Sequence, residues 1–188
     1  MKSLRYLIEY MFVRIFYMIF RILGLHISSF VAGKIFKIYG VFSKRTSTAL
    51  INIGDVIKDK NSKERKKIIF KMWENFGRVI GEYPSLNKIR VIDNERIKII
   101  NIRNLLTPLK NNKNCLFFSA HLGNWELTSH ALTENGFNIN FIYRAPNNKY
   151  IDILLRRIRL SYGVGLIKKG PKGARECIKV LSKDGGNI

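Results

Sequence analysis

Apolar and polar positions follow different periods along the chain, and the changes of period divide it into stretches. Leu4–Leu25 is strongly apolar, and Phe30–Phe42 is a second, aromatic stretch that carries lysines. Both predict helices that contact a membrane. Between Ser62 and Pro84 the apolar residues recur at helical spacing, which predicts one long amphipathic helix. From Cys115 onward, short apolar runs alternate with helical patterns, which is typical of a β-α-β chain.

The second half of the chain predicts three strands, each followed by a helix. In chain order these elements are expected at Cys115–Phe118, Trp125–Leu132, Phe137–Arg144, Tyr150–Tyr162, Val164–Lys168 and Gly173–Lys183. Two short strands and a short helix are expected before them, at Ile89–Asp93, Ile97–Ile100 and Asn104–Lys110. The alternation predicts an α/β fold with a mainly parallel sheet, flanking helices and an N-terminal membrane-associated helical segment.

The N-terminal stretch is apolar but contains charges, which leaves two membrane arrangements open. It has no small-residue cleavage site, so we do not expect a removable signal peptide. Arg14 lies in the middle of the segment, where a charge costs about 2.5–3.5 kcal/mol on insertion. The surrounding apolar residues can offset that cost in a single span, and the alternative is a helix that lies in the membrane interface.

Charge indicates an anionic partner without naming it. Lys and Arg number 34 against 13 Asp and Glu, so the net charge is +21, which suits nucleic acid, anionic lipid or an acidic protein. No RNA-recognition or zinc-finger signature is present, which disfavours nucleic acid. Cys115 and Cys177 do not form a disulfide framework, so a reducing compartment is expected. His26 and His130 are interpreted as ordinary helix residues, and we expect no metal site.

His121 and Glu126 are the candidate chemical groups. His121 lies at the carboxyl end of the predicted strand Cys115–Phe118, where open α/β sheets bind ligands. A turn followed by a helix allows the Glu126 carboxylate to fold back on the imidazole. A histidine oriented by a carboxylate takes a proton from a hydroxyl near neutral pH. The alternative is a histidine bonded to a nearby carbonyl and a first-turn acid that favours the helix dipole.

The residues from Ser119 to Glu126 resemble the His-x-x-x-x-Asp/Glu signature of the lysophospholipid acyltransferase superfamily. The particular form, SAHLGNWE, is similar to that of the bacterial lipid A lauroyl/myristoyl acyltransferases. The segment Asn75–Pro84 resembles an upstream helix of that family. Its downstream block is matched by Tyr143, Arg144, Asn147, Asp152, Arg159 and Gly163.

The resemblance implies transfer of a fatty acyl group from acyl carrier protein to a hydroxyl of a lipid A precursor, at the cytoplasmic face of the bacterial inner membrane. It implies His121 as the base and Glu126 as the group that orients it. Residues 1–45 would be membrane-anchoring or interfacial helices, and residues 46–188 the acyltransferase domain. The expected partners are the carrier protein, the glycolipid and the membrane, with no nucleic acid and no cofactor.

Four further residues are candidates for substrate binding. Gly123 and Asn124 form the turn whose backbone N–H groups would stabilise an oxyanion. Arg159 matches an arginine that the family uses near its active site, and Arg144 follows a strand where its guanidinium would hold a phosphate. Arg156 and Arg157 on the same predicted helix are interpreted as a solvated basic face.

Two alternatives remain, together with one departure from the family. The same His/Glu chemistry acylates glycerophospholipids, and a basic chain of this kind is also compatible with a non-catalytic membrane-binding or nucleic-acid-binding protein. Family members continue beyond Gly185–Gly186 into another strand and further helices. We therefore expect this chain to be C-terminally truncated, with the catalytic pair present and one wall of the acyl pocket missing.

Overall fold

The computed structural model describes residues 2–92 and 97–188, which form two compact units. One unit contains Met1–Arg14 and Leu86–Ile188, and the other contains Ile15–Ser85. The predicted α/β class is confirmed, because several helices accompany a small parallel sheet and a long apolar helix begins the chain. The predicted division into a membrane-contacting part, residues 1–45, and an acyltransferase domain, residues 46–188, differs from these two units and stays a prediction.

The first helix, α1 (Lys2–Phe42), covers both apolar stretches of the sequence and bends at Gly24. Gly24 has φ 73° and ψ 174°, a conformation that glycine adopts readily because it has no Cβ. The Ser28 hydroxyl donates to the carbonyl oxygens of Phe20 and Gly24, so part of the backbone hydrogen bonding lost at the bend is replaced. Within the described residues, α1 is the helix long and apolar enough to cross a membrane.

The Ile15–Ser85 unit is a helical assembly of α1, α2 (Lys44–Val56) and α3 (Ser62–Glu82). The predicted amphipathic helix is therefore confirmed, and it starts with a capping box between Asn61 and Glu64. Glycines allow a close crossing of α1 and α3: a Cβ at Gly77 would meet the Ala32 carbonyl, and one at Gly81 would meet the carbonyl of Ser28. Small residues on both helices thus set their separation.

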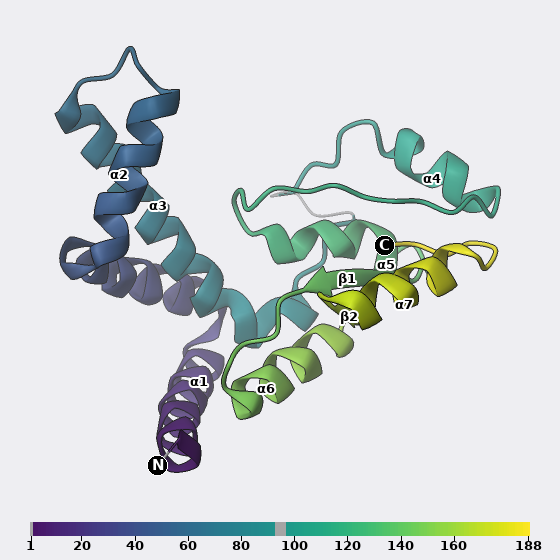
Figure 1. Cartoon of the computed structure of the whole chain (residues 1–188), viewed down its shortest axis with the longest axis horizontal. Helices are drawn as coiled ribbons and strands as arrows, with labels where there is room; N and C mark the ends of the chain where they lie inside the picture. The colour runs from purple at the N-terminus through teal and green to yellow at the C-terminus, as the bar shows by residue number, and fades with distance from the viewer. Residues whose placement is uncertain (1, 93–96) are drawn as a thin grey trace. The chain divides into compact units, whose positions relative to one another are not determined.

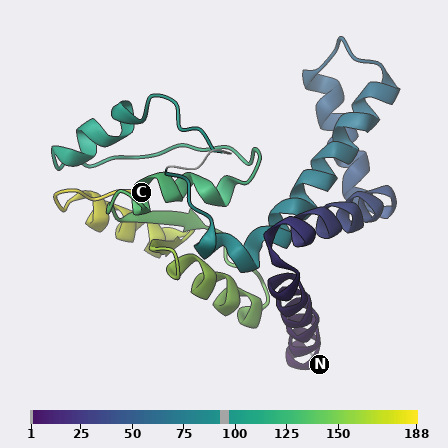
Figure 2. The same cartoon turned by 180° about the vertical axis from the view of Figure 1, so that it is seen from behind.

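The other unit holds the sheet. Strands β1 (Ile139–Tyr143) and β2 (Val164–Lys168) pair in parallel, with Ile139 opposite Val164, and helix α6 (Lys149–Leu160) connects them. Both strands are rich in aliphatic residues, and β1 also contains Phe141 and Tyr143; such side chains suit a pleated, half-buried surface. The views in Figures 1 and 2 show the two strands side by side with α6 next to them. These predicted elements are confirmed to within a few residues.

Helices cover both faces of the strand pair. On one face, Ile139 and Val164 join a core with Leu109 of α4 (Ile102–Lys110) and Leu132 of α5 (His130–Thr133). On the other face, α7 (Pro171–Leu181) contacts β2: a Cβ at Gly173 would overlap the Lys168 carbonyl oxygen and would touch the Ile167 side chain at 3.4 Å. The predicted helix at Asn104–Lys110 is confirmed by α4, which contains Pro108.

The predicted strand at Cys115–Phe118 is wrong as a regular element. The segment is extended, but it forms only an isolated parallel bridge, between Cys115 and Asn187. Its hydrogen bonds run to Gly186–Ile188: the Cys115 N–H donates to Gly186 and the Phe117 N–H to Ile188. Asn187 also accepts a bond from the Asn140 N–H of β1. A single bridge does not extend into the ladder that a regular strand needs.

Three other expected elements differ from the structure. Residues 89–92 and 97–100 form no strand, and Asp93 lies outside the described residues. The backbone N–H groups of Val91 and Ile92 donate instead to the carboxylate of Glu134, which replaces a strand partner. The helix expected at Trp125–Leu132 is a 3₁₀ turn, η2 (Trp125–Ser129), that continues into α5. A second 3₁₀ helix, η1 (Tyr83–Lys88), follows α3.

Candidate active site

The turn before η2 fixes Glu126 in the protein interior. Gly123 has φ 55°, a left-handed conformation that reverses the chain. The side-chain oxygen of Asn124 then accepts a hydrogen bond from the Glu126 N–H at 3.2 Å, which caps the first turn. Glu126 is only 1% exposed. A carboxylate is held at this depth only when other groups compensate for its charge.

The compensating groups come from the far end of α6. The Arg159 guanidinium donates from Nη2 to Oε1 of Glu126 at 2.6 Å and from Nε to Oε2 at 3.0 Å. The Tyr162 hydroxyl donates to the same Oε2 at 2.8 Å. The arginine side chain is itself only 14% exposed, so this is a buried bidentate ion pair. Glu126 is therefore fixed in both position and plane.

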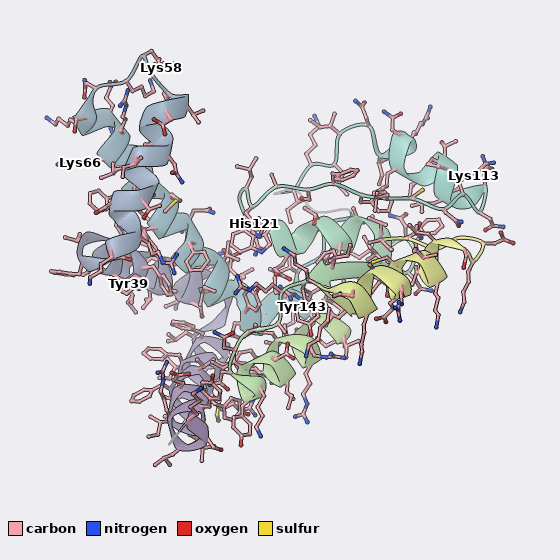
Figure 3. The ribbon with its side chains drawn as sticks, viewed as in Figure 1. Tyr39, Lys58, Lys66, Lys113, His121 and Tyr143 are labelled. Carbon is pink, nitrogen blue, oxygen red and sulfur yellow. The ribbon has the colours of Figure 1, made fainter. Side chains whose placement is uncertain are left out.

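His121 lies in a bend just before this turn, and its side chain is exposed. Figure 3 shows it on the loop that leads into η2. Its ring approaches Trp125, with 5.1 Å between the ring centroids and an angle of 55°. In the part of the chain that the structure describes, no hydrogen bond joins His121 to Glu126. The two predicted residues thus occupy one corner of the fold, an accessible imidazole beside a buried carboxylate, without direct contact.

The arginines on α6 and directly after β1 lie in different environments. Arg144 is exposed directly after β1, and Arg157 is exposed on α6. Arg156 donates from Nη1 to the Tyr143 hydroxyl at 3.3 Å. Arg159 alone among these four turns inward to Glu126. Arg157 therefore fits the interpretation as part of a solvated basic face, whereas Arg159 belongs to the buried site.

Sequence reasoning did not identify Tyr162 or His130. His130 is 2% exposed, its ring stacks on Tyr162 with centroids 4.7 Å apart, and its Nε2 lies 3.0 Å from the Leu86 carbonyl oxygen. One signal was present: Arg159 and Tyr162 are three residues apart at a helix end, a spacing that puts two side chains on one side. Nothing local in the sequence links His130 to them.

The described residues contain no group of three or more His, Cys, Asp or Glu side chains that could hold a metal ion. The imidazole of His121 can exchange protons with a bound substrate, and Glu126 supplies a fixed negative charge nearby.

Comparison with known proteins identifies a family. The family model described as bacterial lipid A biosynthesis acyltransferase matches residues 1–185 of the chain, which include the whole of the site. No curated protein and no solved structure matches the chain.

Proposed function

We propose, because the chain belongs to the bacterial lipid A biosynthesis acyltransferase family, that it transfers a fatty acyl group from acyl carrier protein to a hydroxyl of a lipid A precursor. The observation that carries the proposal is the family match across residues 1–185 together with the placement of Glu126 and His121 in one corner of the fold. A buried, oriented carboxylate next to an accessible imidazole suits activation of a hydroxyl.

In the proposed reaction, His121 removes the proton from the acceptor hydroxyl, and the resulting oxygen attacks the thioester carbonyl carbon. The tetrahedral oxyanion collapses, the C–S bond breaks, and the carrier thiolate takes the proton back from the imidazolium. Glu126 stabilises that imidazolium when the His121 loop brings the ring towards it. Backbone N–H groups at the Gly123–Asn124 turn would stabilise the oxyanion, which is usually the largest single contribution.

The proposed roles of the arginines follow from their environments. Arg159 holds Glu126 in place, and its positive charge favours the negative charge that develops on the intermediate. Arg144, exposed after β1, is a candidate for binding a phosphate of the glycolipid. Both substrates are anionic, which suits a chain of net charge +21.

The proposed location is the cytoplasmic face of the inner membrane, with residues 1–45 as the membrane-contacting part and residues 46–188 as the acyltransferase domain. Helix α1 supports this, because many of its large apolar side chains are exposed, including Ile22 at 84% and Phe42 at 81%. Exposed apolar surface of this extent on one helix is typical of a membrane contact.

The test is acyl transfer by the purified chain in vesicles that contain a lipid A precursor, with labelled acyl carrier protein as donor. We expect His121→Ala and Glu126→Ala each to lower kcat by about 10²–10⁴-fold. His26→Ala and Glu176→Ala are the matched controls, because both residues are exposed and lie outside the site. Near-full activity of His121→Ala would show that the base is wrongly assigned, and faster transfer to a glycerophospholipid acceptor would overturn the choice of substrate.

A further inference from the structure

The end of α6 presents two donors to the same carboxylate oxygen. Oε2 of Glu126 accepts from Nε of Arg159 at 3.0 Å and from the hydroxyl of Tyr162 at 2.8 Å. The arginine already compensates for the charge of the carboxylate through its two bonds. The tyrosine adds a neutral donor with a fixed direction. The Tyr162 hydroxyl therefore fixes the orientation of the Glu126 carboxylate as well as stabilising its charge.

The turn that follows α6 keeps Tyr162 next to Arg159. Helix α6 ends at Leu160, and the N–H of Tyr162 then donates to the Arg159 carbonyl at 3.3 Å. Gly163 follows with φ 87°, and its N–H donates to Leu160. A left-handed residue here turns the chain into β2, so Tyr162 stays on the side of the helix end that Arg159 also occupies.

A buried histidine holds the ring of Tyr162. The planes of His130 and Tyr162 are inclined by 28° with centroids 4.7 Å apart, which is a stacked arrangement. A carbonyl oxygen only accepts, so the 3.0 Å contact of His130 Nε2 with Leu86 places the proton on Nε2. Among the described residues, the buried Nδ1 has no hydrogen-bond partner. The histidine is therefore fixed by one bond and by ring stacking.

We propose that Tyr162 is a positioning residue for Glu126, and that His130 acts through it by fixing the tyrosine ring. The inference rests on the proposed function, in which Glu126 orients and stabilises His121. With three donated bonds on two oxygens, the carboxylate cannot rotate about its last torsion without breaking at least one of them. Fixed orientation before the reaction is what electrostatic stabilisation of a developing charge requires.

The decisive variant is Tyr162→Phe, which keeps the stacked ring and removes only the hydroxyl. We expect kcat to fall by about tenfold to a hundredfold with little change in KM, because one hydrogen bond to a charged group is lost. Tyr143→Phe is the matched control, since its hydroxyl contacts Arg156 rather than Glu126. Equal activity of Tyr162→Phe and the wild-type chain would overturn the inference.

Two comparisons separate positioning from a general structural role. In a Glu126→Gln background, Tyr162→Phe should lower kcat no further, because the group it positions has already lost its charge. His130→Phe, which preserves ring stacking, should retain most of the activity, whereas His130→Ala should resemble Tyr162→Phe. A full additional loss in the Glu126→Gln background, or equal losses for both His130 variants, would contradict the proposed pathway through Tyr162.

The inference and the proposed function fail in different ways. Full activity of Glu126→Gln would overturn the proposed function and with it the role of Tyr162 in transfer. A Glu126→Gln variant that is inactive, beside a fully active Tyr162→Phe, would overturn the inference alone. Thermal unfolding supplies a readout independent of activity: the midpoint shift of the double variant should be smaller than the sum of the two single shifts. Additive shifts would show that the two groups are not coupled.

Discussion

Replacement of Arg159 by alanine tests the buried ion pair directly. Glu126 is 1% exposed and the arginine side chain 14% exposed, so the change leaves a carboxylate in the interior without its main compensating charge. Removal of one partner of a buried pair costs about 3–5 kcal/mol of unfolding free energy. Tyr162 still donates to Oε2, which puts the expected loss near the lower end, at about 3 kcal/mol.

Two further variants calibrate this value. Arg159→Lys keeps the positive charge but loses the planar pair of donors, so it should cost roughly one charge-assisted hydrogen bond, about 1.5–3 kcal/mol. Arg156→Ala removes a half-buried guanidinium on the same helix that makes one 3.3 Å contact with a hydroxyl. That loss should be about 1 kcal/mol or less. The expected order is therefore alanine at 159, lysine at 159, then alanine at 156.

The assay is urea unfolding in detergent followed by ¹⁹F NMR of chain labelled with 5-fluorotryptophan. The sequence has two tryptophans, Trp73 and Trp125, and these lie in the two different compact units. The Trp125 signal therefore reports on the unit that contains the site, while the Trp73 signal serves as an internal reference. An Arg159→Ala loss no larger than that of Arg156→Ala would refute the reasoning, because the pair would then contribute no more than a surface contact.

Two predictions concern the helical unit Ile15–Ser85. The ammonium groups of Lys37 and Lys34 lower the pKa of Glu74 from 4.5 to about 2, so its stabilisation is present above about pH 4.5 and is lost as the pH falls towards 2. Glu74→Gln should thus lower the free energy of unfolding at pH 7 by about 1 kcal/mol or less, because solvent screens the half-exposed lysines. In this variant the urea midpoint reported by Trp73 should change less between pH 4.5 and pH 2 than in the wild-type chain. An unchanged pH dependence would contradict this prediction. Gly81→Ala should cost about 1–3 kcal/mol, since its Cβ would lie 2.8 Å from the Ala32 Cβ and closer to the Ser28 carbonyl. Gly54→Ala, which meets only the flexible end of Arg65 at 3.1 Å, should instead be neutral or stabilising by up to about 1 kcal/mol on the same assay, and equal losses at both positions would disprove the close crossing.

Local periodicity was sufficient for the elements whose partners are close in sequence. Strands β1 and β2 and helix α6 form one β-α-β unit, and the apolar pattern of each element predicted it within a few residues. The segment Cys115–Phe118 has an equally apolar pattern, yet its hydrogen-bond partners lie about 70 residues later, at Gly186–Ile188. The regularity of such a segment depends on the length of a distant partner, which no local pattern contains.

In the candidate site, too, local sequence predicted single residues but not the contacts between residues that are distant in sequence. Motif and turn chemistry singled out Glu126 and Arg159 one at a time, but their pairing across 33 residues is a property of the folded chain. The expected turn and helix also predicted that the Glu126 carboxylate folds back on His121, whereas in the described residues it bonds to Arg159 and Tyr162. The roles of these residues in transfer stay predictions. His130 stacks on Tyr162 because α5 packs near the end of α6, and periodicity carries no information about that contact.

The position of Gly186–Ile188 affects the order in which the sheet can form. Residues from this segment bond to Cys115 and Phe117 on one side and to Asn140 of β1 on the other, so a late part of the chain lies between the Cys115–Phe117 segment and the edge of β1. During synthesis, β1 and β2 emerge first and can pair through their short connection. At that stage the backbone groups of Cys115, Phe117 and Asn140 still lack their partners in Gly186–Ile188. Pairings of such long sequence separation are slow to form. Until they form, the β1 edge of the strand pair lacks this partner, and unpaired strand edges are typical starting points for aggregation.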